Sequence, residues 1–206
     1  MFATPTFGAS APSLRLDSDP RAERLLHEHR KLAACTRSYV QSRPDLASLG
    51  DDPLINQLLA SNGFSAIDAV VCRVAFDGRI VTAIVVPTRV WRDQEARARL
   101  FEIKGQAAAI RTAVILVPQR WVRADIRNSV ARLIAQSRNT RVQQKQLRDI
   151  LAFLRKERIT TITEAASVIS DHRDPFGALL ALAAQGLIDI DRSRKLAADS
   201  FVFTRL

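Results

Sequence analysis

Two runs of β-branched and apolar residues joined by Asp77-Gly78 constrain the fold of this chain more than any other feature. The first run spans residues 69–76 and the second spans residues 79–86. Asp-Gly between two such runs is typical of a tight hairpin turn, because both turn positions need a positive φ. We therefore expect an antiparallel hairpin, which excludes a purely helical fold.

The segments around this hairpin predict a small α/β domain over residues 19–119. Apolar residues recur at helical spacing before and after the hairpin, and a continuous apolar run then ends at Pro118. We expect helices over residues 20–34, 53–59 and 91–109, and a buried strand over residues 113–117. The order helix, strand, strand, helix, strand describes a small mixed sheet with flanking helices.

The C-terminal third predicts a second domain, a winged helix-turn-helix over residues 142–206. Thr161 and Glu164 have the spacing of a capping box, and Asp174-Pro175 has the chemistry of a helix start. We expect helices over residues 142–154, 164–169 and 175–185, a short extended segment over residues 159–162, and strands over residues 187–191 and 200–203. Three helices followed by a β-hairpin are the pattern of this domain class.

Length and composition allow a protein of two small domains. The chain has 206 residues, of which 47% are hydrophobic and 25% are charged, so each domain can bury a core. Cys35 and Cys72 lack metal-ligand spacing and are expected to be reduced thiols. No apolar run reaches about 18 residues and no export signal precedes residue 20, so we expect a cytoplasmic protein. Residues 1–18 lack periodicity and are expected to form a mobile tail.

The net charge of +10 favours a polyanionic partner. Five of the 31 basic residues are lysines and the others are arginines, whose planar guanidinium matches the geometry of phosphate. A GC-rich genome, which favours arginine throughout, is the alternative explanation of this bias. The position of the charge is therefore more informative than its total.

Most of the net charge lies in and just after a basic connecting helix that we expect over residues 120–141. Eight basic side chains stand there with Asp125 as the single acid, and such a stretch repels itself unless a partner neutralises it. We predict that this stretch contacts DNA through Arg120, Arg123, Arg127, Arg132, Arg138, Arg141, Lys145 and Arg148. In the loop of the predicted C-terminal hairpin, we predict phosphate contacts from Arg192, Arg194 and Lys195.

The last helix of the predicted winged helix offers few hydrogen-bond donors. In a DNA-reading helix-turn-helix this helix enters the major groove and presents Arg, Lys, Asn or Gln to base edges. We expect Ala178, Ala181 and Gln185 on its outer face and the leucines toward the core. Because small side chains favour close packing, we predict that this face docks a protein and does not read a DNA sequence.

The order of elements, together with local sequence patterns, resembles the TnsA-like transposon endonucleases. These patterns are Asp19-Pro20-Arg21-Ala22-Glu23, Asp68 before the first strand of the hairpin, Asp77-Gly78, and the run from Asp174 to Asp191. The resemblance covers nearly the whole chain after residue 18. It implies a restriction-endonuclease-like PD-(D/E)XK fold, DNA cleavage at transposon ends beside a transposase, and a C-terminal domain that engages partner proteins of the transposition machinery.

The chemistry implied by this resemblance needs an Asp on one strand and an acid-x-Lys pattern on the next. Two carboxylates must hold Mg²⁺ while the lysine supports the attacking water. Asp68 matches the first acid, but residues 83–88 read Ala-Ile-Val-Val-Pro-Thr, without a carboxylate or a lysine. This alignment predicts a nuclease-like scaffold with a vestigial Asp68, no metal and no cofactor.

A different register would restore an active endonuclease. Glu102 and Lys104 have acid-x-Lys spacing, and Asp77 or Asp93 could complete a Mg²⁺ site. The apolar residues around Glu102 recur at helical spacing, however, which favours a solvated helix face.

We therefore expect a DNA-binding accessory protein of a transposition-like complex, without catalysis or with weak catalysis. An active Mg²⁺-dependent endonuclease and a winged-helix transcriptional regulator are the alternatives. We expect weakly sequence-specific DNA and proteins of the complex as partners, and no membrane.

Overall fold

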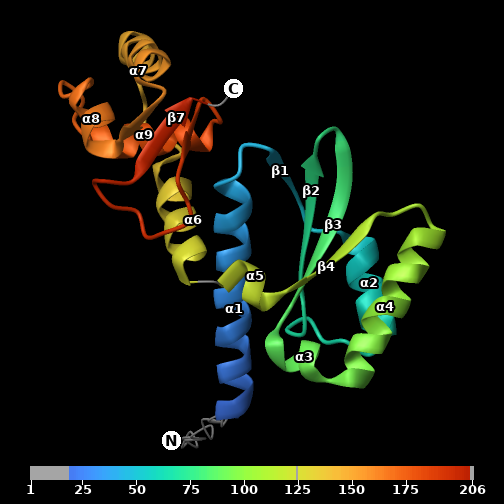
Figure 1. Ribbon diagram of the computed structural model, residues 1–206. Coiled ribbons are helices and arrows are strands. Elements are labelled where there is room, and N and C mark those ends of the chain that lie inside the picture. The colour runs from blue at the N-terminus through green and yellow to red at the C-terminus, as the bar shows by residue number, and fades with distance from the viewer. Residues whose placement is uncertain (1–18, 124, 205–206) are drawn as a thin grey trace, which may run out of the picture.

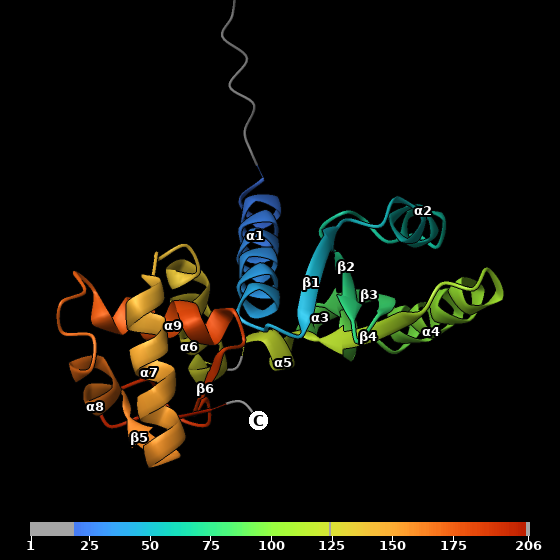
Figure 2. The ribbon, with the colours of Figure 1, turned by 90° about the horizontal axis from the view of Figure 1, so that it is seen from above.

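A computed structural model describes residues 19–123 and 125–204. The described chain forms two units with α1 (Pro20–Gln41) between them, and it is a mixed α/β protein as the sequence predicts (Figures 1 and 2). The predicted tail, residues 1–18, lies outside the described residues. Within the described chain, no helix combines the length and the apolar character that crossing a membrane requires.

The larger sheet contains the predicted hairpin. Its strands are β1 (Leu46–Gly50), β2 (Val70–Phe76), β3 (Arg79–Val86) and β4 (Val114–Pro118), in the order β1-β2-β3-β4. β2 is antiparallel to β1 and β3, whereas β4 runs parallel to β3. Phe76 pairs with Arg79 across the turn, where Asp77 has φ 49° and Gly78 has φ 71°. The Asp-Gly hairpin is confirmed, while β1 occupies a segment in which we predicted no strand.

α2 (Pro53–Ser61) and α4 (Gln94–Ala109) cover one face of this sheet, and the short α3 (Thr88–Arg92) links β3 to α4 (Figure 1). α4 turns a helical stripe toward the sheet, in which Leu100 and Ile103 are fully buried. Asp52 ties α2 to β3, because one carboxylate oxygen accepts from the Ile55 amide and the other accepts from the buried Thr82 hydroxyl at 2.6 Å. One hydrogen-bonded polar link thus fixes α2 within an otherwise apolar layer.

α1 and α5 (Gln119–Arg123) lie on the other face of the sheet, where Leu32, Val85 and Val122 form a small core. α1 runs seven residues past its predicted end at Ala34. Thr36 and Val40 continue the buried stripe of Leu32 at a spacing of four residues, and the Thr36 hydroxyl donates to the Leu32 carbonyl at 2.9 Å. The helix continues because its buried stripe continues, and the hydrogen bond allows the Thr36 hydroxyl to be buried there.

The C-terminal unit contains the elements that the sequence predicts. They are α6 (Asp125–Ser137), α7 (Gln144–Glu157), β5 (Ile159–Thr161), α8 (Ile162–Ser167), α9 (Pro175–Ala184), β6 (Ile188–Ile190) and β7 (Phe201–Thr204). Thr161 and Glu164 form the predicted capping box of α8, and Asp174 accepts from the Gly177 amide at the start of α9. β7 lies between β5 and β6 and is antiparallel to both.

α9 is enclosed by the rest of the unit. Every residue from 177 to 184 is buried. α6 packs along α9 and contributes Val130 and Ile134 to the same core, and it also packs against α1 (Figure 2). Much of the predicted connecting helix is therefore part of the interior packing of the C-terminal unit.

Candidate nucleic-acid interface

Most cations of the central basic stretch are exposed. Its cations lie on α5, on α6, in the α6–α7 connection and on α7, and no ion pair between described side chains includes any of them. Arg123 is half-buried, and the exposed members are Arg120, Arg132, Arg138, Arg141, Lys145 and Arg148. The side chain of Arg127 lies outside the described part of the chain.

The exposed face of α7 carries the last cations of the stretch. Ile150 and Leu154 turn toward the core, which leaves Lys145, Arg148 and Arg155 on the solvent side at helical spacing. We did not include Arg155 among the predicted DNA contacts. Its position seven residues after Arg148 is the signal that identifies it.

The three predicted cations of the β6–β7 loop have different environments. Arg194 lies 3.8 Å from a carboxylate oxygen of Asp191 and 3.6 Å from one of Asp199, and its guanidinium stacks over Phe201. Two acids therefore neutralise Arg194 within the loop. Lys195 is exposed and forms no ion pair with a described side chain, whereas Arg192 points inward.

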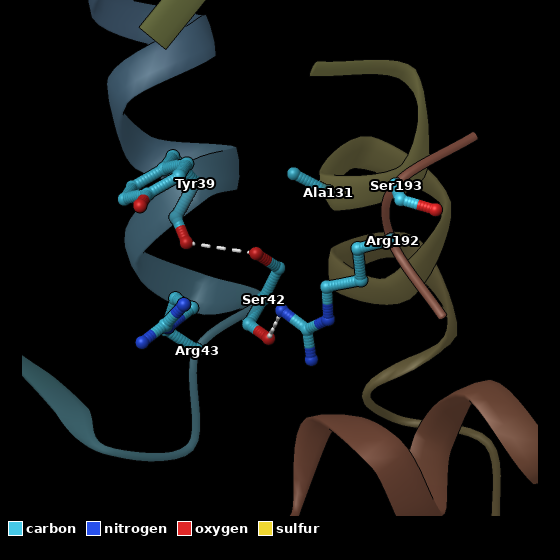
Figure 3. A pocket seen from close by; sticks show the side chains of 6 residues that line it. All are labelled: Tyr39, Ser42, Arg43, Ala131, Arg192 and Ser193. Atoms are coloured by element: carbon cyan, nitrogen blue, oxygen red, sulfur yellow. Dashed lines mark hydrogen bonds between the residues drawn. The ribbon is translucent and has the colours of Figure 1, made fainter. Parts of the chain in front are cut away.

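Arg192 enters a polar cavity of about 390 Å³ between α1, α6 and the β6–β7 loop (Figure 3). The cavity is lined by Tyr39, Ser42, Arg43, Ala131, Arg192 and Ser193. Arg192 Nη1 donates to the Ser42 carbonyl at 3.0 Å, and the Ser42 hydroxyl donates to the Tyr39 carbonyl at 2.8 Å. Burial is the largest influence on the pKa of Arg192 and lowers it.

Arg43 lines the same cavity but is already paired. Its Nε and Nη2 donate to the two carboxylate oxygens of Asp45, each at 2.9 Å, and this bonding raises the pKa of Arg43. Arg43 follows α1 in the sequence, far from Arg192. No local pattern could have shown that the two arginines meet, and we did not predict Tyr39, Ser42 or Arg43 as site residues.

The prediction that Ala178 and Ala181 lie on an outer face is wrong. Both are completely buried, and of the three predicted docking residues only Gln185 is exposed. The face that appears free in the sequence is covered by α6 of the same chain. A helix without a charged residue on any side is the pattern of a helix buried all round.

Asp68 precedes β2, as predicted, and is held by neighbours. Its carboxylate accepts from the Ser65 amide and hydroxyl and from Arg89 Nη1, the last at 2.7 Å. Burial alone would raise the pKa of Asp68, but the hydrogen bonds from Ser65 and Arg89 outweigh it and lower this pKa.

The strand beside β2 presents apolar groups where the family resemblance would place an acid and a lysine. Ala83 and Val85 face the α1 side of the sheet, where Val85 packs with Leu32 and Val122. Ile84 is fully buried beneath the helices of the opposite face.

The rival register is wrong, because Glu102 and Lys104 lie on α4 and not on a strand. Both are exposed. Asp93 caps α4 by accepting from the amides of Glu95 and Ala96, and Asp77 forms the hairpin turn. Among the described residues, no three His, Cys, Asp or Glu side chains gather as a metal site.

A larger polar cavity, of about 560 Å³, lies between α1, α2 and the start of β2. Polar side chains from both helices and from the β1–α2 connection line it, including His29, Arg37, Asp51 and Asn56. His29 Nδ1 is buried there without a hydrogen-bond partner among the described residues. We did not predict this cavity.

The comparisons with known proteins bring no family to these observations. No protein-family model matches the chain, and no curated protein matches it. The resemblance to TnsA-like endonucleases therefore remains a prediction from the sequence.

Proposed function

We propose that this chain is a DNA-binding accessory protein of a DNA-mobilisation complex and that it contacts the phosphate backbone without strong sequence readout. The observation that carries the proposal is the set of exposed cations on α5, α6 and α7, which form no ion pair with a described carboxylate. Exposed arginines without acidic partners gain most from a polyanion, because each neutralised phosphate releases a condensed counterion.

The burial of α9 supports weak sequence dependence. The strand order β5-β7-β6 and the three preceding helices support a winged-helix interpretation of the C-terminal unit. In such a domain α9 would be the helix that enters the major groove, yet its side chains are enclosed from residue 177 to residue 184. The transcriptional-regulator alternative has no exposed reading helix in this arrangement.

The α/β unit supports the proposal of a nuclease-like scaffold. Its chain order, α1-β1-α2-β2-β3-α3-α4-β4, with β1, β2 and β3 antiparallel and β4 parallel to β3, supports the restriction-endonuclease-like interpretation. Metal-dependent cleavage needs paired carboxylates. Asp68 is bound to Arg89, and β3 carries Ala83 and Val85 where the second carboxylate would stand. We propose that this unit holds and orients DNA or a protein of the complex and does not cleave.

A salt titration of DNA binding tests the proposal. We expect log K for a short duplex of random sequence to fall steeply with log salt, and the triple variant Arg120→Gln, Arg132→Gln, Arg148→Gln to reduce the slope by about two to three units. The matched control is Arg92→Gln, Arg97→Gln, Lys104→Gln, which removes the same charge from exposed positions of α3 and α4. Equal slopes for the two triple variants would contradict the proposed interface.

Incubation with plasmid and Mg²⁺ or Mn²⁺ tests the scaffold interpretation separately. We expect the plasmid to remain supercoiled. Nicking that disappears in Asp68→Ala would overturn the scaffold interpretation and leave the DNA-binding proposal intact.

A further inference from the structure

The three arginines around the β6–β7 loop differ in what balances their charge. Arg43 has both oxygens of Asp45, and Arg194 has Asp191 and Asp199. Arg192 has one described hydrogen-bond partner, the Ser42 carbonyl, and forms no ion pair with a described carboxylate. A guanidinium carries five N–H donors, and the described hydrogen bond of Arg192 engages one of its nitrogens.

Partial burial adds to the free-energy cost of the Arg192 charge. Arg192 is half-buried, and a partly desolvated charge without a close partner is unfavourable. Asp189 and Asp45 favour the charged form from a distance, while Arg43 opposes it. Asp45 is bound by Arg43, and Asp189 accepts from the Ile190 amide at 3.0 Å. Neither carboxylate replaces a direct anionic partner for Arg192.

The cavity beside Arg192 has the size and the chemistry for such a partner. Its volume of about 390 Å³ exceeds what one phosphate group needs. The Arg192 guanidinium reaches into it toward the end of α1, while the Ser42 hydroxyl is turned to the Tyr39 carbonyl and the Ser193 hydroxyl points away from the guanidinium (Figure 3). A guanidinium is a common protein donor to phosphate oxygens, so Arg192 supplies the chemistry of the cavity.

We infer that this cavity is a phosphate-binding pocket in which Arg192 holds one phosphate group of the nucleic-acid backbone. The inference rests on the proposed function and adds to it a discrete anion site apart from the open surface of α7. A phosphate bound there lies between the end of α1 and the β6–β7 loop of the C-terminal unit. It therefore stabilises their packing as well as the DNA complex.

Two measurements on the full chain test the pocket. Inorganic phosphate or pyrophosphate should raise the Tm of the unchanged protein by mass action, and Arg192→Gln should abolish the increase. With duplex DNA lacking 5′ phosphates, Arg192→Gln should lower the salt slope by about one unit. If only the inorganic ions bind at Arg192, the slope is unchanged and the assignment of the ligand as the nucleic-acid backbone is wrong.

Arg194→Gln is the matched control, because it removes the same charge from the same loop where two acids already neutralise it. The glutamine at position 192 keeps a donor for the Ser42 carbonyl, and unchanged circular dichroism and Tm without phosphate verify that the fold persists. Arg192→Lys separates the effect of the charge from that of the guanidinium shape. The salt slope of this variant should equal that of the unchanged protein, while its affinity for DNA should be lower.

The outcomes separate this inference from the proposed function. If the triple variant of α5, α6 and α7 reduces the slope while Arg192→Gln behaves as Arg194→Gln does, the interface stands and the pocket is wrong. If no variant changes the slope but phosphate raises the Tm through Arg192, the pocket binds phosphate and the proposed interface is wrong.

Discussion

α4 and α9 are both alanine-rich helices that begin at an Asp cap, yet one side of α4 faces solvent and α9 is buried on every side. In α4, charged residues such as Arg97 and Glu102 stand between the alanines and are exposed. In α9 no charged residue occurs at any position. The difference shows that the position of charge around a helix, and not the size of its small residues, indicates which face is free.

The largest expected effect is the loss of folding in Ala181→Arg. Ala181 is completely buried, so the substitution inserts a long charged side chain into a packed core. We expect the free energy of unfolding to fall by more than about 4 kcal/mol. Chemical denaturation followed by circular dichroism measures the change, and a cooperative transition at the original midpoint would show that α9 has a free face.

A smaller loss is expected for Gly177→Ala in the first turn of α9. A Cβ at this position would overlap the Asp174 carboxylate, which accepts the Gly177 amide at 2.9 Å. Displacing the cap should lower the free energy of unfolding by about 1 kcal/mol. A gain in the denaturation midpoint would mean that the cap can rotate away without cost.

The same substitution in α4 should have the opposite sign. Gly105 lies in the exposed part of α4, and a Cβ added there meets no atom within 4 Å. Alanine restricts the unfolded chain and favours the helix, so Gly105→Ala should add about 0.5–1 kcal/mol of stability. A destabilised protein would indicate that the exposed side of α4 is covered in solution.

The smallest effect is expected for Ala98→Arg, the counterpart of Ala181→Arg on α4. Ala98 is exposed, and arginine has a high helix propensity. The free energy of unfolding should change by less than about 0.5 kcal/mol. A loss comparable to that of Ala181→Arg would remove the distinction between the two helices.

Local chemistry made some of the fold predictable and left the rest to tertiary packing. The turn at Asp77 and Gly78 and the caps at Thr161 and Asp174 act within four residues, so the sequence alone predicts them. β1 could not be predicted in this way, because residues 46–50 contain no β-branched side chain and form a strand only by pairing with β2.

The candidate sites also divide into features that local sequence determines and features that tertiary contacts determine. Exposure along α7 follows from helical spacing, so Lys145 and Arg148 were predictable as surface cations. The neighbourhood of Arg192 depends on the end of α1 meeting the β6–β7 loop, a contact between distant segments that no periodicity encodes. The burial of α9 depends in part on α6, which we predicted to be a connector.

The packing of α6 also determines where the chain can be truncated without uncovering the core around α9. A fragment that begins at residue 142 lacks Val130 and Ile134, which complete the core around α9. Its newly uncovered alanine and leucine surface would pair with other copies or bind a chaperone, so self-association of such a fragment would reflect the missing helix. A fragment that begins at residue 125 retains α6 and the core around α9, and the surface it uncovers is the side of α6 that packs against α1.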